Sequence, residues 1–305
     1  CLKNEATVRQ IYDLAVEAIQ NEKKHYWGFS SRFPGSILHG AVEALQMLIG
    51  VLKRLRAIAD DDADRFSSEG FVTLFAMLKK ELGDDYFEEL RIHLRQLRFR
   101  GGVLISADLG KGNKGINYIL RKPHAPDPSW AKRMLAEVQQ VIAEKVFSEP
   151  PPTYTFVLHP RDEAGARALS TLRDRGINLV ANALAQSADH IVSFFTMLRT
   201  ELAFYVGCLN LQQRLNGMGE PVCFPVPAVA SERRHSFRGL YDISLALTLK
   251  GRIVGNDVNA DGKDLTIVTG ANQGGKSTYL RSIGLSQLMM QCGMFVPAQS
   301  FSANV

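Results

Sequence analysis

The sequence predicts a mixed α/β protein, in which an α-rich region with a small β hairpin precedes a strand, a glycine-rich loop and a helix. Three observations support this fold class: helical spacing of apolar residues in the first hundred residues, two β-like runs joined by glycines near residues 102–121, and a β-branched run at residues 265–268. With 305 residues, the chain is long enough for two domains. We predict an α-rich domain over residues 1–216 and a second domain over residues 217–305.

The composition is that of an ordinary globular protein. Hydrophobic residues make up 46% of the chain and charged residues 22%. No apolar run approaches the roughly 20 residues of a membrane span, so we predict no membrane contact. The four cysteines lie far apart without metal-site spacing, which favours reduced thiols and a cytoplasmic location. The first residue is not methionine, and we therefore expect a fragment of a longer chain.

Four helices are predicted in the first hundred residues. The second begins after Pro34, with Ser36 as its N-cap, and ends at the acidic cluster of residues 60–62. Shorter helices are expected at about 69–82 and 84–97. The first helix is indicated by apolar residues at three- and four-residue spacing: Val8, Ile11, Tyr12, Ala15, Ala18 and Ile19.

The middle of the chain changes character. Residues 103–105 and 116–120 are strand-like, and the three glycines of residues 110–115 can supply the positive φ values that a hairpin turn needs. A helix is expected near residues 129–147, and a strand at residues 153–158.

A further helix is expected after Asp162, which is a candidate N-cap. The longest helical pattern of the chain runs over residues 177–214. Beyond a turn at residues 216–221, we expect strands at residues 222–226 and 240–249, as well as the β-branched run already named.

Residues 270–277 fit the phosphate-loop (Walker A) pattern G-x-x-x-x-G-K-[ST]. Glycines let the backbone curl so that successive N–H groups face phosphate oxygens. Lys276 would reach the β- and γ-phosphates, and the Ser277 hydroxyl would ligate Mg²⁺. The helix expected at about 276–291 adds the positive end of its dipole. We therefore predict that ATP is bound by Gly270, Ala271, Asn272, Gln273, Gly274, Gly275, Lys276, Ser277 and Thr278.

The stretch from Thr269 to Arg281 resembles the TGPNMGGKSTYLR signature of the MutS family, and residues 293–298 resemble its G-x-[FY]-V-P-A segment. This resemblance implies a DNA-binding ATPase of mismatch repair or a related DNA transaction. It also implies that residues 217–305 are the first part of a P-loop (MutS/ABC-type) ATPase domain. In that family, ATP binding is transmitted along lever helices to a DNA-clasping region, and two ATPase domains pair in a homodimer. The helix at residues 177–214 resembles such a lever.

The sequence departs from the family pattern at several positions. Ala271 stands for the family proline and Gln273 for its methionine, which implies a divergent branch. Ile253 falls near the position where the family often has an aromatic residue beside the adenine. The family's catalytic carboxylates lie on a strand well after the loop, whereas residues 278–305 contain neither aspartate nor glutamate. We therefore assign no catalytic residue, and we expect this chain to bind ATP without turning it over.

A basic segment at residues 91–122 holds eight cations against a single acid, Asp108. Such a segment can hold a DNA backbone by charge without reading bases. The candidates are Arg91, Arg95, Arg98, Lys111 and Lys114. The three arginines have i, i+4 and i+7 spacing, on one helix face, and the two lysines lie in the hairpin turn. An ordinary solvated face remains the alternative.

Two other functions stay open at this point: a nucleotide-gated protein-interaction scaffold, and an ABC-type ATPase outside repair. A downstream ST-x-x-x-E segment would favour the MutS type, and an LSGGQ-like segment the ABC type. DNA binding that weakens steeply with salt would separate the first function from the scaffold.

Overall fold

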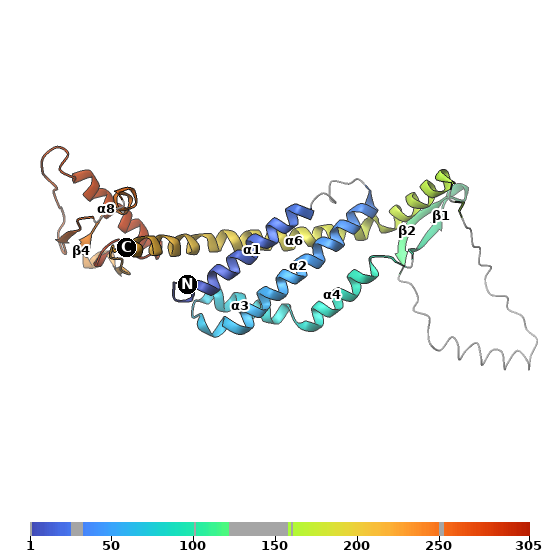
Figure 1. The fold of residues 1–305 in the computed structure, drawn as a ribbon, viewed down its shortest axis with the longest axis horizontal. Coiled ribbons are helices and arrows are strands. Elements are labelled where there is room, and N and C mark those ends of the chain that lie inside the picture. Colours follow the sequence, from blue (N-terminus) through green and yellow to red (C-terminus); the bar gives the residue numbers. More distant parts are fainter. Residues whose placement is uncertain (1, 26–32, 101, 122–157, 160, 250–252) are drawn as a thin grey trace, which may run out of the picture. The chain divides into compact units, whose positions relative to one another are not determined.

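The computed structural model describes residues 2–25, 33–100, 102–121, 158–159, 161–249 and 253–305 (Figure 1). These residues are mostly helical and include a two-stranded and a four-stranded sheet, so the mixed α/β class is confirmed. They form two compact units. We call residues 13–199 the middle unit, and residues 1–12 together with 200–305 the terminal unit.

The four helices expected in the first hundred residues are confirmed. They are α1 (Glu5–His25), α2 (Pro34–Asp62), α3 (Glu69–Glu81) and α4 (Asp84–Gln96). The predicted N-cap Ser36 is wrong, because Phe33 occupies that position and Pro34 begins the helix. Proline suits a first helical residue, since the N–H that it lacks would have no partner inside the helix. As expected, α2 ends in the acidic cluster, at Asp62.

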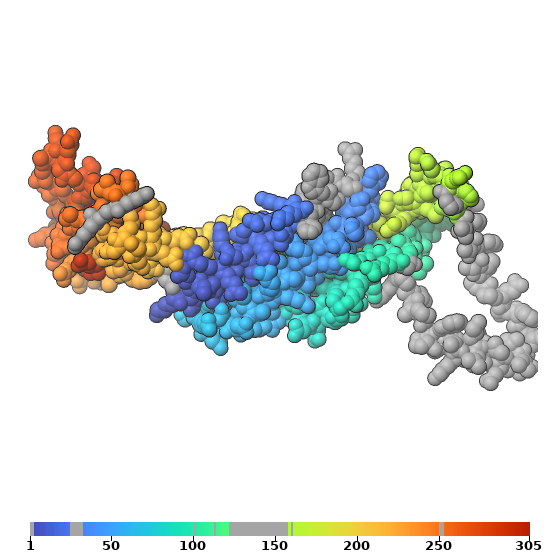
Figure 2. Space-filling view, viewed as in Figure 1, coloured from blue at the N-terminus to red at the C-terminus, as the bar shows by residue number. Residues whose placement is uncertain are grey.

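The core of the middle unit is built on α2, which packs against α3 and α4. The surfaces of these helices adjoin one another in Figure 2. Its buried stripe is Leu38, Ala41, Val42, Ala44, Leu45, Leu48, Val51, Leu52, Leu55, Ile58 and Ala59. Where α2 gives way to α3, the ring of Phe66 lies 4.5 Å from that of Phe71 and 5.3 Å from that of Phe75, centroid to centroid. Three aromatic rings therefore anchor this junction.

Two described helices meet the length and hydropathy of a membrane span, contrary to the expectation that no such segment exists. They are Pro34–Arg65, which contains α2, and α6 (Glu163–Gly217). These two helices meet the criteria by length and composition only, and core helices of soluble proteins meet the same criteria. The apolar stripe of α2 is used inside the middle unit, as described above.

The predicted hairpin is confirmed. Strand β1 (Leu104–Leu109) pairs antiparallel with β2 (Gly115–Arg121), and Leu104 lies opposite Arg121. The turn between them contains a short 3-10 helix, Lys111–Asn113. Of the three turn glycines, only Gly112 has a positive φ, at 73°.

Helix α6 is 55 residues long and joins the two helical segments that were predicted separately. Its start is capped as predicted, because Oδ1 of Asp162 accepts the N–H of Gly165 at 2.8 Å. The helix ends at Gly217, next to the predicted domain boundary, which stays a prediction. The expected helix near residues 129–147 and strand at residues 153–158 lie outside the described residues.

The hairpin docks on α6 at Gly176. The Arg175 guanidinium lies 5.6 Å from the ring centroid of Tyr118. A Cβ at Gly176 would come within 2.5 Å of Cδ1 and 2.7 Å of Cγ1 of Ile105. The branched Ile105 side chain therefore occupies the space that a side chain at position 176 would need.

We expect Gly176→Ala to weaken hairpin docking by about 1–3 kcal/mol, because it overpacks this contact. Amide hydrogen exchange in β1 and β2 should become faster. Gly207→Ala is the matched control on the same helix, since a Cβ there meets nothing within 4 Å. Unchanged exchange in the hairpin of the Gly176 variant would contradict this description of the docking.

The terminal unit contains a four-stranded sheet of order β3-β6-β4-β5. The strands are β3 (Val226–Ala228), β4 (His235–Leu240), β5 (Asn256–Asn259) and β6 (Ser300–Asn304). Strand β6 pairs parallel with β3 and antiparallel with β4, and β4 pairs antiparallel with β5. A 3-10 turn, Ala230–Glu232, separates β3 from β4. Helices α7 (Ile243–Leu249) and α8 (Lys276–Gln291) complete the unit.

Three predicted strands need correction here. Residues 240–249 are mainly helix α7, because a continuous apolar run does not distinguish a buried strand from a buried helix. Of residues 222–226, only the last lies in a strand, and Cys223 forms an isolated bridge with Val296. Residues 265–268 are not a strand: they pair with none of the described strands, and a single strand leaves its backbone groups without ladder partners.

Candidate functional site

The glycine-rich loop, residues 270–275, curls directly before α8. Gly275 has a φ of 82° and forms the N-cap of α8, a left-handed conformation that suits glycine. Gln273 also has a positive φ, of 65°. The N–H of Gly274 donates to the carbonyl of Ala271 at 3.1 Å, and a Cβ at Gly274 would lie 3.0 Å from that oxygen. The loop geometry thus depends on glycine at 274 and 275.

Lys276 is the first residue of α8, which begins where the sequence predicted. Its Nζ donates to the carbonyl oxygens of Gly270 at 2.7 Å and Ala271 at 2.6 Å, so the ammonium group lies over the loop. Ser277 is exposed in the same first turn. A helix start leaves its first N–H groups without intrahelical partners and carries a partial positive charge. The loop, the ammonium and the helix start together suit an anion with several oxygens.

A cavity of about 740 Å³ adjoins this loop. Its lining includes Gly274, Gly275 and Lys276 of the loop region, and also the apolar residues Leu245, Ile253, Val254 and Val258. The volume falls in the range of small-molecule sites. The cavity lining therefore combines loop residues that suit an anion with apolar residues.

Asp242 is a site residue that sequence reasoning missed. Its side chain is 1% exposed, and it lies in the cavity wall. Oδ1 accepts the N–H of Leu245 at 3.0 Å, which caps α7, and Oδ2 accepts the Nε of Arg281 from α8. The one available signal was an aspartate placed just before an apolar run, which is typical of a helix N-cap. Because both oxygens are engaged, Asp242 joins α7 to α8.

Other acids near the loop in sequence lie outside the cavity wall. Asp257 accepts the N–H of Gly239 at 2.6 Å, and Asp261 accepts the N–H of His235 at 2.7 Å. Asp264 pairs with Arg233. Burial lowers the pKa of the His235 imidazole, and the nearby Asp261 carboxylate opposes that shift.

Two of the candidate DNA-binding residues, Arg91 and Arg98, form ion pairs with acids in the structure. Arg91 pairs with Glu88, whose pKa is lowered by the hydrogen bond from Arg91. Arg98 donates to Oε1 of Glu43 and of Gln46, at 2.7 Å each. Arg98 thus ties the end of α4 to α2. In the part of the chain that the structure describes, Arg95, Lys111 and Lys114 are exposed and form no ion pair with an acid.

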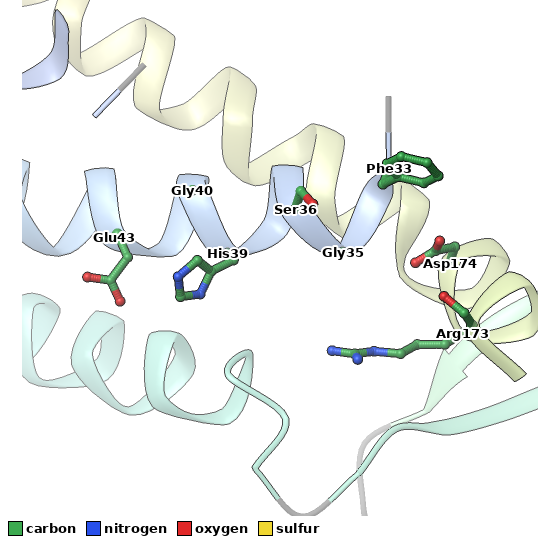
Figure 3. A pocket seen from close by; sticks show the side chains of 9 residues that line it. Phe33, Gly35, Ser36, His39, Gly40, Glu43, Arg173 and Asp174 are labelled. Atoms are coloured by element: carbon green, nitrogen blue, oxygen red, sulfur yellow. The ribbon is translucent and has the colours of Figure 1, made fainter. Parts of the chain in front are cut away.

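A cavity of about 680 Å³ lies beside the Arg98–Glu43 pair, and it mixes both charges. Figure 3 shows Arg173 of α6 extended toward His39 and Glu43 of α2. Asp174 stands at the start of α2, where a Cβ on Gly35 would lie 3.4 Å from its Oδ1. The balance of charges here does not mark a site for a polyanion.

Comparisons with known proteins identify the family. Residues 1–218 match the MutS2 N-terminal domain, and residues 266–305 match MutS domain V. The DNA mismatch repair protein MutS of Lactococcus lactis is 30% identical over 151 residues, which cover 45% of this chain and 17% of that protein. The DNA mismatch repair protein MutS of Bacillus subtilis is 31% identical over 118 residues, which cover 34% of this chain and 14% of that protein.

A third relative, the DNA mismatch repair protein MutS of a Synechococcus species, is 53% identical over 51 residues, 16% of this chain and 6% of that protein. This chain therefore spans only a small part, 17% or less, of these three relatives. Since the MutS2 N-terminal domain match alone covers more than half of the 305 residues, the chain belongs to the MutS family.

Proposed function

We propose that this chain is the part of a MutS-type ATPase that binds ATP with Mg²⁺ at residues 270–278 and contributes to DNA binding. The observation that carries the proposal is the curled loop at the start of α8, with Lys276 over it and a cavity beside it. The residues present fit a nucleotide: glycines give room for phosphate oxygens, and apolar residues in the cavity lining suit a base.

Each residue of the site has a defined task in this proposal. The N–H groups of the loop and of the first turn of α8 hold the phosphates. Lys276 exchanges the carbonyls of Gly270 and Ala271 for phosphate oxygens, and Ser277 supplies its hydroxyl to Mg²⁺. When bound, Mg²⁺ would neutralise phosphate charge. The apolar wall around Ile253 and Val258 excludes water from the base.

The wider setting follows from family membership. We propose that residues 217–305 are the first part of a P-loop ATPase domain, and that α6 acts as the lever through which ATP binding reaches a DNA-clasping region. We also propose a cytoplasmic homodimer that pairs through its ATPase domains, without membrane contact. The relatives are named for DNA mismatch repair, a process that acts on DNA.

A calorimetric titration of the chain with ATP in the presence of Mg²⁺ tests the nucleotide part. We expect saturable binding of one nucleotide per chain, and weaker binding when Mg²⁺ is chelated. A flat titration at millimolar ATP would refute the proposal.

For DNA, the proposal is tested on Arg95, Lys111 and Lys114, which form no ion pair with an acid among the described residues. Changing all three to glutamate should lower DNA affinity and flatten the plot of log affinity against log salt, by roughly 0.9 for each phosphate that the protein no longer neutralises. The matched control reverses Lys23, Lys24 and Lys79, which are equally exposed in the same unit. If affinity and salt slope both stay at the wild-type values, the basic segment is an ordinary solvated face.

A further inference from the structure

Part of the cavity wall is a short segment, residues 253–256, which leads into β5. Ile253 and Val254 line the same cavity as Gly274 and Gly275 of the glycine-rich loop. In the proposed function, the loop fixes the place of the phosphates, so the base of a bound nucleotide falls against this wall. The position of the wall therefore decides how much of the binding energy the base contributes.

Two sets of contacts hold the segment in place. At its start, the N–H of Ile253 donates to Oε1 of Glu220 at 2.8 Å. At its end, Gly255 crosses the backbone of Gly239 so closely that a Cβ on Gly255 would lie 2.6 Å from the carbonyl oxygen of Gly239. The side chain of Asp257, in β5, accepts the N–H of the same Gly239. The end of the wall is thus fixed to β4, and its start depends on Glu220.

Glu220 is an unusual residue for a surface turn, because it is only 5% exposed. Burying a carboxylate is unfavourable unless hydrogen bonds compensate for the lost water, so the hydrogen bonds of Glu220 matter strongly for the stability of this place. Its backbone N–H donates to the carbonyl of Leu215, in the last turn of α6, at 3.1 Å. One residue therefore closes the end of α6 with its backbone and holds the cavity wall with its side chain.

The surroundings of Glu220 support its role as an anchor. Tyr241 is 1% exposed, and its hydroxyl has no hydrogen-bond partner among the described residues. Burial raises the pKa of Tyr241, and the charge of Glu220 raises it further. The phenol is uncharged at neutral pH, and the acceptor that holds the N–H of Ile253 is the Glu220 side chain.

We propose that Glu220 is a positioning residue that fixes the base-side wall of the nucleotide cavity from the turn that ends α6. This inference rests on the proposed function. In it, the part of the affinity that comes from the base depends on Glu220, and the part that comes from the phosphates depends on the glycine-rich loop. Loss of the Glu220 acceptor should therefore weaken the binding of a nucleotide much more than that of a bare polyphosphate.

The experiment measures two affinities, for ATP and for inorganic tripolyphosphate, both with Mg²⁺. The variants are Glu220→Met, which keeps most of the volume but has no oxygen, and Glu220→Gln, which keeps Oε1 as an acceptor. We expect E220M to bind ATP about tenfold more weakly, as the loss of a buried hydrogen bond implies, and to bind tripolyphosphate as the wild type does. E220Q should restore most of the ATP affinity. Glu232→Ala, an exposed glutamate of the same unit, serves as the control.

The possible outcomes separate the two proposals. If E220M binds both ligands more weakly to the same extent, a general structural defect explains the result, and the proposed role of Glu220 is overturned. If E220M binds both ligands as the wild type does, the contact is unimportant, and the role is overturned as well. ATP affinity as low in E220Q as in E220M would also overturn it, since the acceptor is kept there. Failure of the wild-type chain to bind either ligand would instead refute the proposed function itself.

Discussion

Replacing Lys276 with alanine is expected to remove measurable binding of ATP with Mg²⁺. The lysine amine lies over the loop, within hydrogen-bond distance of two carbonyl oxygens, and contributes the one lysine charge in the wall of the cavity. Hydrogen bonds between charged groups contribute about 1.5–3 kcal/mol each, so losing its phosphate contacts should weaken binding by roughly a hundredfold or more.

The fold should survive this change, because Lys276 fills no part of the buried core. Calorimetric titration measures the affinity, and thermal unfolding checks that the variant is folded. Lys263→Ala is the matched control: it removes a lysine that lies in the same unit, on an exposed turn. Wild-type affinity in Lys276→Ala would show that the loop does not bind the phosphates.

The second large effect is an absence of turnover: the chain should bind ATP but release no phosphate above background. Hydrolysis in P-loop ATPases needs a group that orients the attacking water, in addition to the loop and the metal. Among the described residues, the only acid in the cavity wall is Asp242. Both of its oxygens are already engaged, one by Leu245 and one by Arg281.

Steady-state phosphate release, measured with and without Mg²⁺, tests this expectation, and the Lys276→Ala variant supplies the background. Release by the wild-type chain that depends on both Mg²⁺ and Lys276 would contradict it. In that case a catalytic group must lie within the 305 residues, and Asp242 would be the first residue to exchange for asparagine.

The parts of the fold that follow from local chemistry could be predicted from the sequence. Helix α2 was predictable because its apolar residues repeat with the helical period and proline marks its start. The curl of residues 270–275 and the start of α8 followed from the requirements of a phosphate loop. The hairpin followed from two β-like runs and a glycine-rich link.

Other features depended on partners that are distant in sequence. An apolar run such as residues 240–249 fits a strand or a helix equally, and the buried cap at Asp242 decides for the helix. Glu220 contacts Ile253, 33 residues away, and Asp242 contacts Arg281, 39 residues away, so no local pattern predicts either of these contacts. In the sequence, Arg98 of the basic segment has no nearby acid as a partner, because its partner Glu43 lies on another helix.

The central claim is that residues 270–278 hold the phosphates of ATP, and site-resolved hydrogen exchange tests it most directly. Exchange is measured peptide by peptide, with Mg²⁺ alone and with Mg²⁺ plus saturating ATP. We predict slower exchange at residues 270–278, where backbone N–H groups face the phosphates, with a smaller effect at residues 253–256. Unchanged exchange at residues 270–278, with protection confined to other parts of the chain, would contradict the account.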